Sequence, residues 1–176
     1  AGPGFGTRFR GAPLVGPGGL TDGGGHVGAI AAAVSVPVVV DADTGFGNSL
    51  NMRRTVQLLE SAGAAAIIVE DQSFPKRCGH FKDKSVIPVQ EMVTKVMAAV
   101  DARKTDMAII ARTDARSTEG LSSALDRAAA YQAAGADVMF VEAPETVEEL
   151  AEIPRQVPGR HLCNMVVGGR TPLCEQ

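Results

Sequence analysis

The chain repeats one pattern over most of its length: a short apolar run that ends at a polar residue, followed by a longer amphipathic stretch. Short runs rich in Val, Ile and Ala are typical of strands buried on both faces, and their alternation with helical stretches predicts strand-helix units around a parallel sheet. The apolar runs are residues 36–40, 66–69, 107–111, 138–141 and, more weakly, 160–163, and the polar residues that follow them are Asp41, Glu70, Arg112, Glu142 and Asn164.

Three stretches between the runs have helical character. Residues 49–62 and 121–134 are each followed by a glycine, Gly63 and Gly135, which can adopt the left-handed conformation that ends many helices. A third helix is expected over residues 89–100, because five apolar residues there recur at the spacing of one helical face. They are Val89, Met92, Val93, Val96 and Val100.

The polar residues after the apolar runs are expected to meet at one rim. Parallel strands place their carboxyl ends on the same side of a sheet, and barrel enzymes have their chemistry there. For any single position, a polar residue that only begins a solvent-exposed loop is the better explanation of the pattern. Five such positions in sequence, most of them charged, favour a functional rim.

The two ends of the chain differ from this pattern. Residues 1–25 contain ten of the twenty glycines and show neither strand nor helix periodicity, so we predict a Gly/Pro-rich tail there that is disordered or aberrant. We predict one domain over residues 26–176. About five strand-helix units are recognisable in it, fewer than the eight that close a barrel.

Charge and hydropathy limit the partners. The formal net charge is −3 and no long basic run is present, so nothing favours binding to nucleic acid or to an anionic membrane. No apolar stretch approaches the roughly 20 residues that span a bilayer. Three widely spaced cysteines indicate reduced thiols rather than disulfides. We expect a cytoplasmic protein whose partners are small molecules or copies of itself.

A candidate metal site follows the first apolar run. Asp41 and Asp43 lie two residues apart within DADTGFGN, and Glu70 ends the next run. Carboxylates suit Mg²⁺, which prefers oxygen ligands and usually keeps several waters. The alternative is that Asp43 caps the helix near Ser49 and Asp41 binds loop amides.

Two further segments suggest catalysis and substrate binding. The loop that begins at EDQSFPKRCGH surrounds Cys78 with basic residues, and such surroundings lower the pKa of a thiol and suit proton transfer. Arg112, in ARTD, has a planar fork that can bind a substrate carboxylate. A salt bridge from Arg112 to Asp114 or Glu142 is an equally good interpretation.

These motifs together resemble the methylisocitrate lyase branch of the isocitrate lyase and phosphoenolpyruvate mutase superfamily. The resemblance runs from about residue 30 to residue 173 and is carried, in order, by DADTGFGN, EDQSFPKRCGH, IARTDA, VEAPE and NMVVGGRTP. It implies a (β/α)8 TIM barrel, of which this chain contains part, and a homotetramer with an exchanged C-terminal helix.

The resemblance also implies roles for single residues. Asp41 would bind Mg²⁺, or Mn²⁺, directly, while Asp43 and Glu70 act mainly through water. Cys78 would be the catalytic acid or base, and His80 would help to close its loop over the ligand. The substrate-contacting positions would be Arg112, Glu142, Asn164 and Thr171.

The activity implied is retro-aldol cleavage of a small 2-hydroxy di- or tricarboxylate such as 2-methylisocitrate. A base takes the hydroxyl proton, the carbon–carbon bond breaks, and the metal and Arg112 hold the enolate until Cys78 protonates it. The cysteine motif favours this lyase over a phosphonate-forming mutase or an oxaloacetate decarboxylase. A catalytically inactive remnant is the further alternative.

Two features of the family are not found in the sequence. Residues 1–25 contain neither the Ser-Gly substrate loop nor a convincing second metal-associated aspartate, since Asp22 lacks the family context. The chain also stops at Gln176, before the last barrel units. We therefore expect a gene that is truncated or read in a shifted frame at its start, which a search of all reading frames for the N-terminal motif would test.

Overall fold

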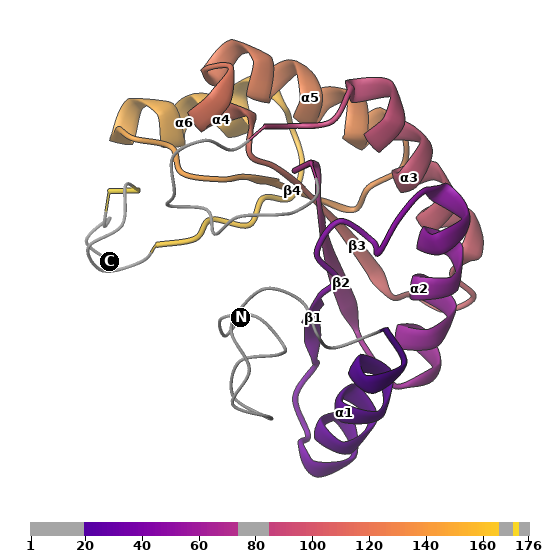
Figure 1. The fold of residues 1–176 in the computed structure, drawn as a ribbon. Helices are drawn as coiled ribbons and strands as arrows, with labels where there is room; N and C mark the ends of the chain where they lie inside the picture. Colours follow the sequence, from indigo (N-terminus) through magenta and orange to yellow (C-terminus); the bar gives the residue numbers. More distant parts are fainter. Residues whose placement is uncertain (1–19, 74–84, 166–170, 173–176) are drawn as a thin grey trace.

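The computed structural model describes residues 20–73, 85–165 and 171–172. Strands and helices alternate along these residues and form an arc with the strands on its inner side and the helices on its outer side (Figure 1). The elements are α1 (Leu20–Ala33), β1 (Val39–Asp41), α2 (Ser49–Ser61), β2 (Ala66–Glu70), α3 (Val89–Ala102), β3 (Ala108–Thr113), α4 (Ala115–Thr118), α5 (Leu121–Ala133), β4 (Val138–Val141) and α6 (Val147–Gln156).

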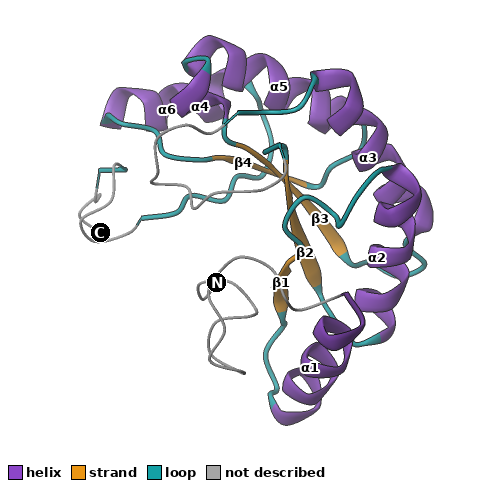
Figure 2. Ribbon diagram, viewed as in Figure 1, coloured by secondary structure: helices purple, strands orange, loops and turns teal. Residues whose placement is uncertain are grey.

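The described strands form one parallel sheet in the order β1-β2-β3-β4, so each strand pairs with the next one in the sequence (Figure 2). Its register aligns Asp41 with Ile68, Glu70 with Arg112, and Arg112 with Phe140. This topology is that of successive strand-helix units wound in one direction, as the alternating apolar pattern predicted.

The two faces of the sheet have different surroundings. Ile67, Val69 and Ile109 belong to the main core, where they pack with buried residues of α2, α3 and α5. The alternate residues Ile68 and Ile110 belong to a small second cluster on the opposite, inner face. Because side chains alternate along a strand, the polar residues at even positions, Glu70, Arg112 and Glu142, share this inner face, as does Asp41 on β1.

Most predicted strands are confirmed, with two differences. The first strand begins at Val39 rather than at residue 36. Pro37 lies in the predicted residues that are not part of the strand, and it has no backbone N–H to donate to a neighbouring strand. Residues 160–163 form no strand, but they run beside β4. His161 makes an isolated parallel bridge to Met139, and the amide of Leu162 donates to the carbonyl of Met139.

The predicted helices and their glycine ends are confirmed. Helices α2, α3 and α5 match the three expected stretches to within two residues at their ends. Gly63 and Gly135 follow α2 and α5 with φ angles of 89° and 102°, in the region that favours glycine. The short helix α4 and helix α6 are additional to the prediction.

The predicted tail over residues 1–25 is wrong at its end, because α1 begins at Leu20. Its three consecutive glycines, residues 23–25, have low helix propensity, which hides the helix from a periodicity analysis. Packing stabilises it instead: Val27 is buried in the main core and Gly24 lies against Leu58 of α2. None of the described helices is long and apolar enough to cross a membrane.

Candidate active site at the carboxyl ends of the strands

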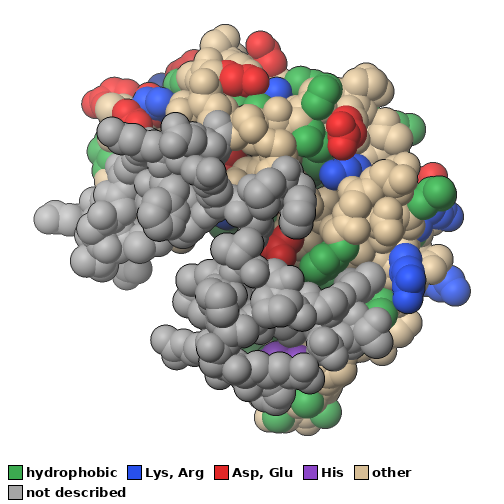
Figure 3. All heavy atoms as spheres, viewed as in Figure 1, with side chains coloured by type: hydrophobic (Ala, Val, Ile, Leu, Met, Phe, Trp, Pro, Cys, Tyr) green, Lys and Arg blue, Asp and Glu red, His purple; other side chains and the backbone are tan. Residues whose placement is uncertain are grey.

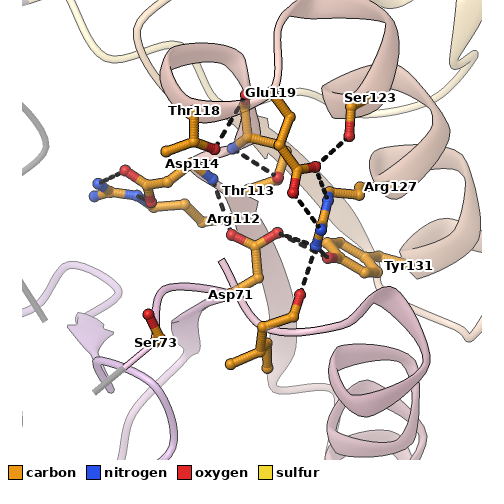
Figure 4. Close-up of polar contacts among 12 residues, drawn as sticks. Asp71, Ser73, Arg112, Thr113, Asp114, Thr118, Glu119, Ser123, Arg127 and Tyr131 are labelled. Carbon is orange, nitrogen blue, oxygen red and sulfur yellow. Dashed lines mark hydrogen bonds and ion pairs between the residues drawn. The ribbon is translucent and has the colours of Figure 1, made fainter. Parts of the chain in front are cut away.

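The guanidinium of Arg112 is the centre of a cluster of carboxylates on the inner face. Its Nε and Nη2 donate hydrogen bonds to Oδ2 and Oδ1 of Asp114, at 2.9 and 3.0 Å (Figure 4). Glu70 and Glu142 approach it from the neighbouring strands, with closest N–O distances of 3.6 and 3.8 Å. The guanidinium carbon lies 5.3 Å from the centre of the Phe140 ring, within cation–π range.

The surroundings of Arg112 keep it charged. Burial alone would lower its pKa, but Asp114, Glu70 and Glu142 raise it well above the usual value of an arginine. The side chain of Arg112 is only 13% exposed. Three carboxyl groups surround one guanidinium, so acidic groups outnumber basic ones, which favours a further cation nearby. Oε2 of Glu142 is buried and makes no hydrogen bond to another described residue.

The loop after β1 brings Asp41 and Asp43 to the same rim. The amide of Asp43 donates to Oδ1 of Asp41 at 2.9 Å, and the amide of Glu70 donates to the carbonyl of Asp43 at 2.8 Å. The structure therefore places the three residues of the predicted metal site at neighbouring strand ends. Of the alternative roles, capping by Asp43 is wrong, because Asn48 caps α2 by accepting from the amides of Leu50 and Asn51. The expected bond of Asp41 to a loop amide is confirmed.

Two residues beside the candidate site have unusual backbone conformations. Asp43 has a φ of 52°, and Ala143, which follows Glu142, has a φ of 55°. Non-glycine residues in this region are strained by about 1 to 3 kcal/mol and cluster at functional sites. The loop that carries Glu142 is thus held in a conformation that its alanine does not favour, whereas the aspartate at position 43 adopts this region more readily than most residues.

The oxygen donors at this rim suit Mg²⁺ in their chemistry. Among the described residues, no three acidic, His or Cys side chains are close enough to enclose a metal ion. Magnesium needs no such enclosure, because it commonly binds through one or two carboxylates and keeps its waters. Asp41, Asp43 and Glu70 fit that mode of binding, and the excess of carboxylates around Arg112 supports it.

The loop that carries Asp43 is anchored by a lysine that the sequence analysis did not identify, and by a glycine of the DADTGFGN motif. Nζ of Lys95, on α3, donates to the carbonyl of Thr44 at 3.3 Å, and burial lowers the pKa of this lysine. Gly45 has a φ of 82°, and a Cβ there would lie 2.2 Å from Cε of the buried Met52. The position of Lys95 among the apolar residues of one face of α3 could have predicted its contact with the loop.

A second buried network lies beside Arg112 and was also missed. Oδ1 of Asp71 accepts from the amide of Asp114 at 2.9 Å, and Oδ2 accepts from the hydroxyl of Tyr131 at 2.7 Å and from Nη1 of Arg127 at 3.4 Å (Figure 4). Arg127 and Tyr131 lie four residues apart on one face of α5. That spacing on an otherwise apolar face was a usable signal.

The remaining predicted site residues are placed less fully. Cys78 and His80 lie outside the described residues. Asn164 is exposed and Thr171 is buried. Figure 3 shows acidic side chains in the middle of the face viewed, bordered by the segments that are not described. The predicted roles of these four residues stay predictions.

Comparison with known proteins identifies the family to which the chain is similar. A family model for phosphoenolpyruvate phosphomutase matches residues 21–176. The 2,3-dimethylmalate lyase of Eubacterium barkeri is 49% identical over 173 residues, which are 98% of this chain and 60% of that protein. A 2-methylisocitrate lyase of Aeropyrum pernix is 52% identical over 143 residues, covering 81% of this chain and 46% of that protein.

Solved structures agree with the fold. The crystal structure of 2,3-dimethylmalate lyase, a PEP mutase/isocitrate lyase superfamily member, superposes with a TM-score of 0.90 at 35% identity, over 96% of this chain and 58% of that one. A phosphonopyruvate hydrolase in complex with oxalate and Mg²⁺ gives 0.75 at 32% identity, over 88% and 54%. The chain spans about three fifths or less of these relatives. It matches TIM-barrel proteins over part of their length.

Proposed function

The chain belongs to the isocitrate lyase and phosphoenolpyruvate mutase superfamily, whose members act on small carboxylates, and we propose that it is a magnesium-dependent carbon–carbon lyase. Its substrate is a small 2-hydroxy di- or tricarboxylate, with 2,3-dimethylmalate and 2-methylisocitrate as the leading candidates. The names of the two relatives at about half identity support these choices.

One observation carries the proposal: a largely buried, permanently charged guanidinium at the carboxyl ends of the strands, among more carboxylates than it can neutralise. The guanidinium suits a carboxylate or enolate oxygen of the substrate. The carboxylates suit the cation that such a substrate chelates. Arg112 and Glu70 are direct neighbours in the sheet register, so the two charges meet on adjacent strands.

The residues of the chain then divide the reaction between them. Asp41 would hold the metal, with Asp43 and Glu70 acting through water, and the bound ion would polarise the substrate oxygens. Arg112 orients the substrate carboxylate. A base accepts the hydroxyl proton, the carbinol carbon becomes the carbonyl of a 2-oxo acid as the carbon–carbon bond breaks, and the bonding electrons pass to the second fragment as an enolate. Arg112 stabilises the negative oxygen of this enolate, and the thiol of Cys78 donates its proton to the enolate carbon.

The test is a substrate panel measured with the whole chain. Release of 2-oxo acid products is followed from 2,3-dimethylmalate, 2-methylisocitrate, oxaloacetate and phosphonopyruvate, with Mg²⁺, with Mn²⁺ and with chelator. Cys78→Ser should reduce turnover of the preferred 2-hydroxy acid at least a hundredfold. Cys163→Ser, at an exposed cysteine, is the matched control and should leave turnover within twofold.

Each other outcome selects a different activity. If phosphonopyruvate were the sole substrate turned over, the activity would be on phosphonates. If oxaloacetate were, it would be a decarboxylation. Either result would exclude the proposed lyase. Calorimetric titration with Mg²⁺ that shows binding without turnover of any substrate would identify an inactive metal-binding chain. The homotetramer that the resemblance implies is tested separately by sedimentation velocity, and a monomer with full turnover would exclude it as a requirement.

A further inference from the structure

Residues 71–73 and 85–87, which flank the segment that contains Cys78 and His80, are paired with each other. The amide of Ser73 donates to the carbonyl of Ser85 at 2.9 Å, and the amide of Ile87 donates to the carbonyl of Asp71 at 2.8 Å. Between them, Gln72 and Val86 form an antiparallel bridge. The two ends of the segment are therefore held as a short antiparallel pair, next to the carboxyl end of β2.

Arg127 of α5 bonds to both ends of this pair. Its Nη1 donates to the carbonyl of Ile87 at 2.9 Å, on the returning end, and to Oδ2 of Asp71 at 3.4 Å, on the departing end. The other edge of the guanidinium is taken by Glu119, through Nε at 3.1 Å and Nη2 at 3.2 Å. Five donors in a rigid plane allow one side chain to make all these contacts.

The contact of Arg127 with Asp71 is buried, whereas its contact with Glu119 is partly exposed to solvent. Asp71 has no exposed side-chain surface and Arg127 has 6%, whereas Glu119 has 40%. Burial alone would lower the pKa of Arg127, but its hydrogen bonds with Tyr131 and Glu119 raise it, so the group stays charged. A buried charge is unfavourable unless its partners are retained, which makes this junction sensitive to the loss of any of them.

The same aspartate connects the segment to the Arg112 cluster. Oδ1 of Asp71 accepts the amide of Asp114, whose carboxylate holds the guanidinium of Arg112. Asp71 also receives hydrogen bonds from Tyr131 and Arg127 on its other oxygen. One carboxylate thus fixes the base of the segment and the backbone of the residue that orients Arg112 (Figure 4).

We propose that Arg127 is a positioning residue that holds Asp71 and Ile87 in register with the Arg112 cluster, and so keeps Asp114, through Asp71, in the place where it orients Arg112. The catalytic part of this inference rests on the proposed lyase function. Arg127 does not touch the substrate. It acts through Asp71 and through the carbonyl of Ile87.

Hydrogen exchange tests the positioning without any assay of activity. In Arg127→Met, the amides of Ile87 and Ser73 should exchange at least tenfold faster, because the junction has lost its cross-link. The amide of Ala108, which donates to Ala65 at the far end of the sheet, should stay within twofold. Arg127→Lys, which keeps one donor in reach, should restore most of the protection.

The matched control is Glu119→Gln, which changes the partner of Arg127 on the exposed side and leaves the contacts with Asp71 and Ile87 intact. Its exchange at Ile87 should stay within twofold of the unmodified chain. An equal acceleration at Ala108 in Arg127→Met would show general destabilisation and overturn the proposal. Unchanged exchange at Ile87 would overturn it as well.

Kinetics test the catalytic part on the preferred substrate. Arg127→Met should lower kcat at least tenfold and change KM less than threefold, because Asp71 and Asp114 then fix the plane of the Arg112 guanidinium less precisely, while the metal and the charge of Arg112 still bind substrate. A normal kcat together with fast exchange at Ile87 would remove the catalytic role. If the unmodified chain cleaves no substrate, the lyase proposal fails, and exchange at Ile87 still decides whether Arg127 anchors the segment.

Discussion

Asp114 binds the guanidinium of Arg112 through two parallel hydrogen bonds, two residues along the chain from it. The pair is bidentate, so it fixes the plane of the guanidinium as well as its position. Neither bond uses Nη1. The arginine is therefore oriented before any ligand arrives, and the salt bridge that was an open alternative in the sequence coexists with the proposed binding of substrate.

This geometry makes Arg112→Lys a non-conservative change. A lysine keeps the charge among the three carboxylates but cannot form the bidentate pair, so substrate orientation should be lost while the fold is retained. We expect kcat/KM to fall by about 30- to 100-fold, equivalent to about 2 to 3 kcal/mol of lost charge-assisted bonding. Steady-state kinetics on the preferred 2-hydroxy acid measure it.

The matched control is Arg155→Lys, on the exposed end of α6, where the side chain is 74% exposed and lies 3.9 Å from Glu152. Its kcat/KM should stay within twofold of the unmodified chain, because exposed ion pairs contribute little. Equal activity of Arg112→Lys and the unmodified chain would contradict the role assigned to Arg112.

The order of strands and the rim residues could be predicted because their signals are local. Each strand is a short apolar run, and each candidate residue follows a run directly, so the rule that parallel strands end on one side placed Asp41, Glu70, Arg112 and Glu142 together. The shared inner face of the last three follows from strand alternation and register. The structure confirms it for two of them, because Glu70 and Arg112 are paired in the sheet register.

What the sequence analysis missed depends on contacts between distant residues. Helix α1 has a glycine-rich start that propensity disfavours, and it is held by packing on α2. The bond from Tyr131 to Asp71 joins residues 60 positions apart. The positive φ angle of Asp43 likewise has no local signature, since aspartate tolerates several loop conformations.

Helix α1 offers a direct test of its packing through two adjacent glycines. Gly25 is exposed and a Cβ there meets nothing within 4 Å, so Gly25→Ala should stabilise the fold by about 0.5 to 1 kcal/mol through helix propensity. At Gly24 a Cβ would lie 2.1 Å from Cδ2 of Leu58, which must shift, so Gly24→Ala should leave the fold at least about 1 kcal/mol less stable than Gly25→Ala does. Urea unfolding gives both values, and equal stabilisation by the two substitutions would mean that α1 does not pack on α2 as described.

Helices α4 and α6 are joined by a salt bridge that should make stability depend on pH. Glu149 accepts two hydrogen bonds from Arg116, at 2.8 and 2.7 Å, and these bonds, with the charge of Arg116, lower the pKa of its carboxyl despite partial burial. A lowered pKa in the folded state stabilises the fold above the unfolded value, about 4.3, and this contribution is lost as the pH falls through the folded value.

Glu149→Gln should therefore cost about 1 kcal/mol in the free energy of unfolding at pH 7 and much less at pH 3, after allowance for solvent screening. Glu152→Gln, at a partly exposed position on the same helix, is the control and should cost less than about 0.5 kcal/mol at both pH values. Chemical unfolding at the two pH values measures both. A cost of Glu149→Gln that does not shrink at pH 3 would mean that the charge of Glu149 is not what joins the helices.

The hydroxyl of Tyr131 is a buried donor to Asp71, and its removal tests the network on its own. Tyr131→Phe keeps the ring in the core but takes a hydrogen bond of 2.7 Å from Asp71 and an acceptor from Arg127, which should destabilise the fold by about 1 to 3 kcal/mol. Burial and the charge of Asp71 raise the pKa of Tyr131, so the hydroxyl stays protonated and the cost should be the same at pH 6 and pH 9.

Ser61→Ala, which removes an exposed hydroxyl at the end of α2, is the control and should change the free energy of unfolding by less than about 0.5 kcal/mol. Urea unfolding of the three proteins at both pH values decides the matter, and a cost of Tyr131→Phe no larger than that of Ser61→Ala would show that Asp71 does not depend on this bond.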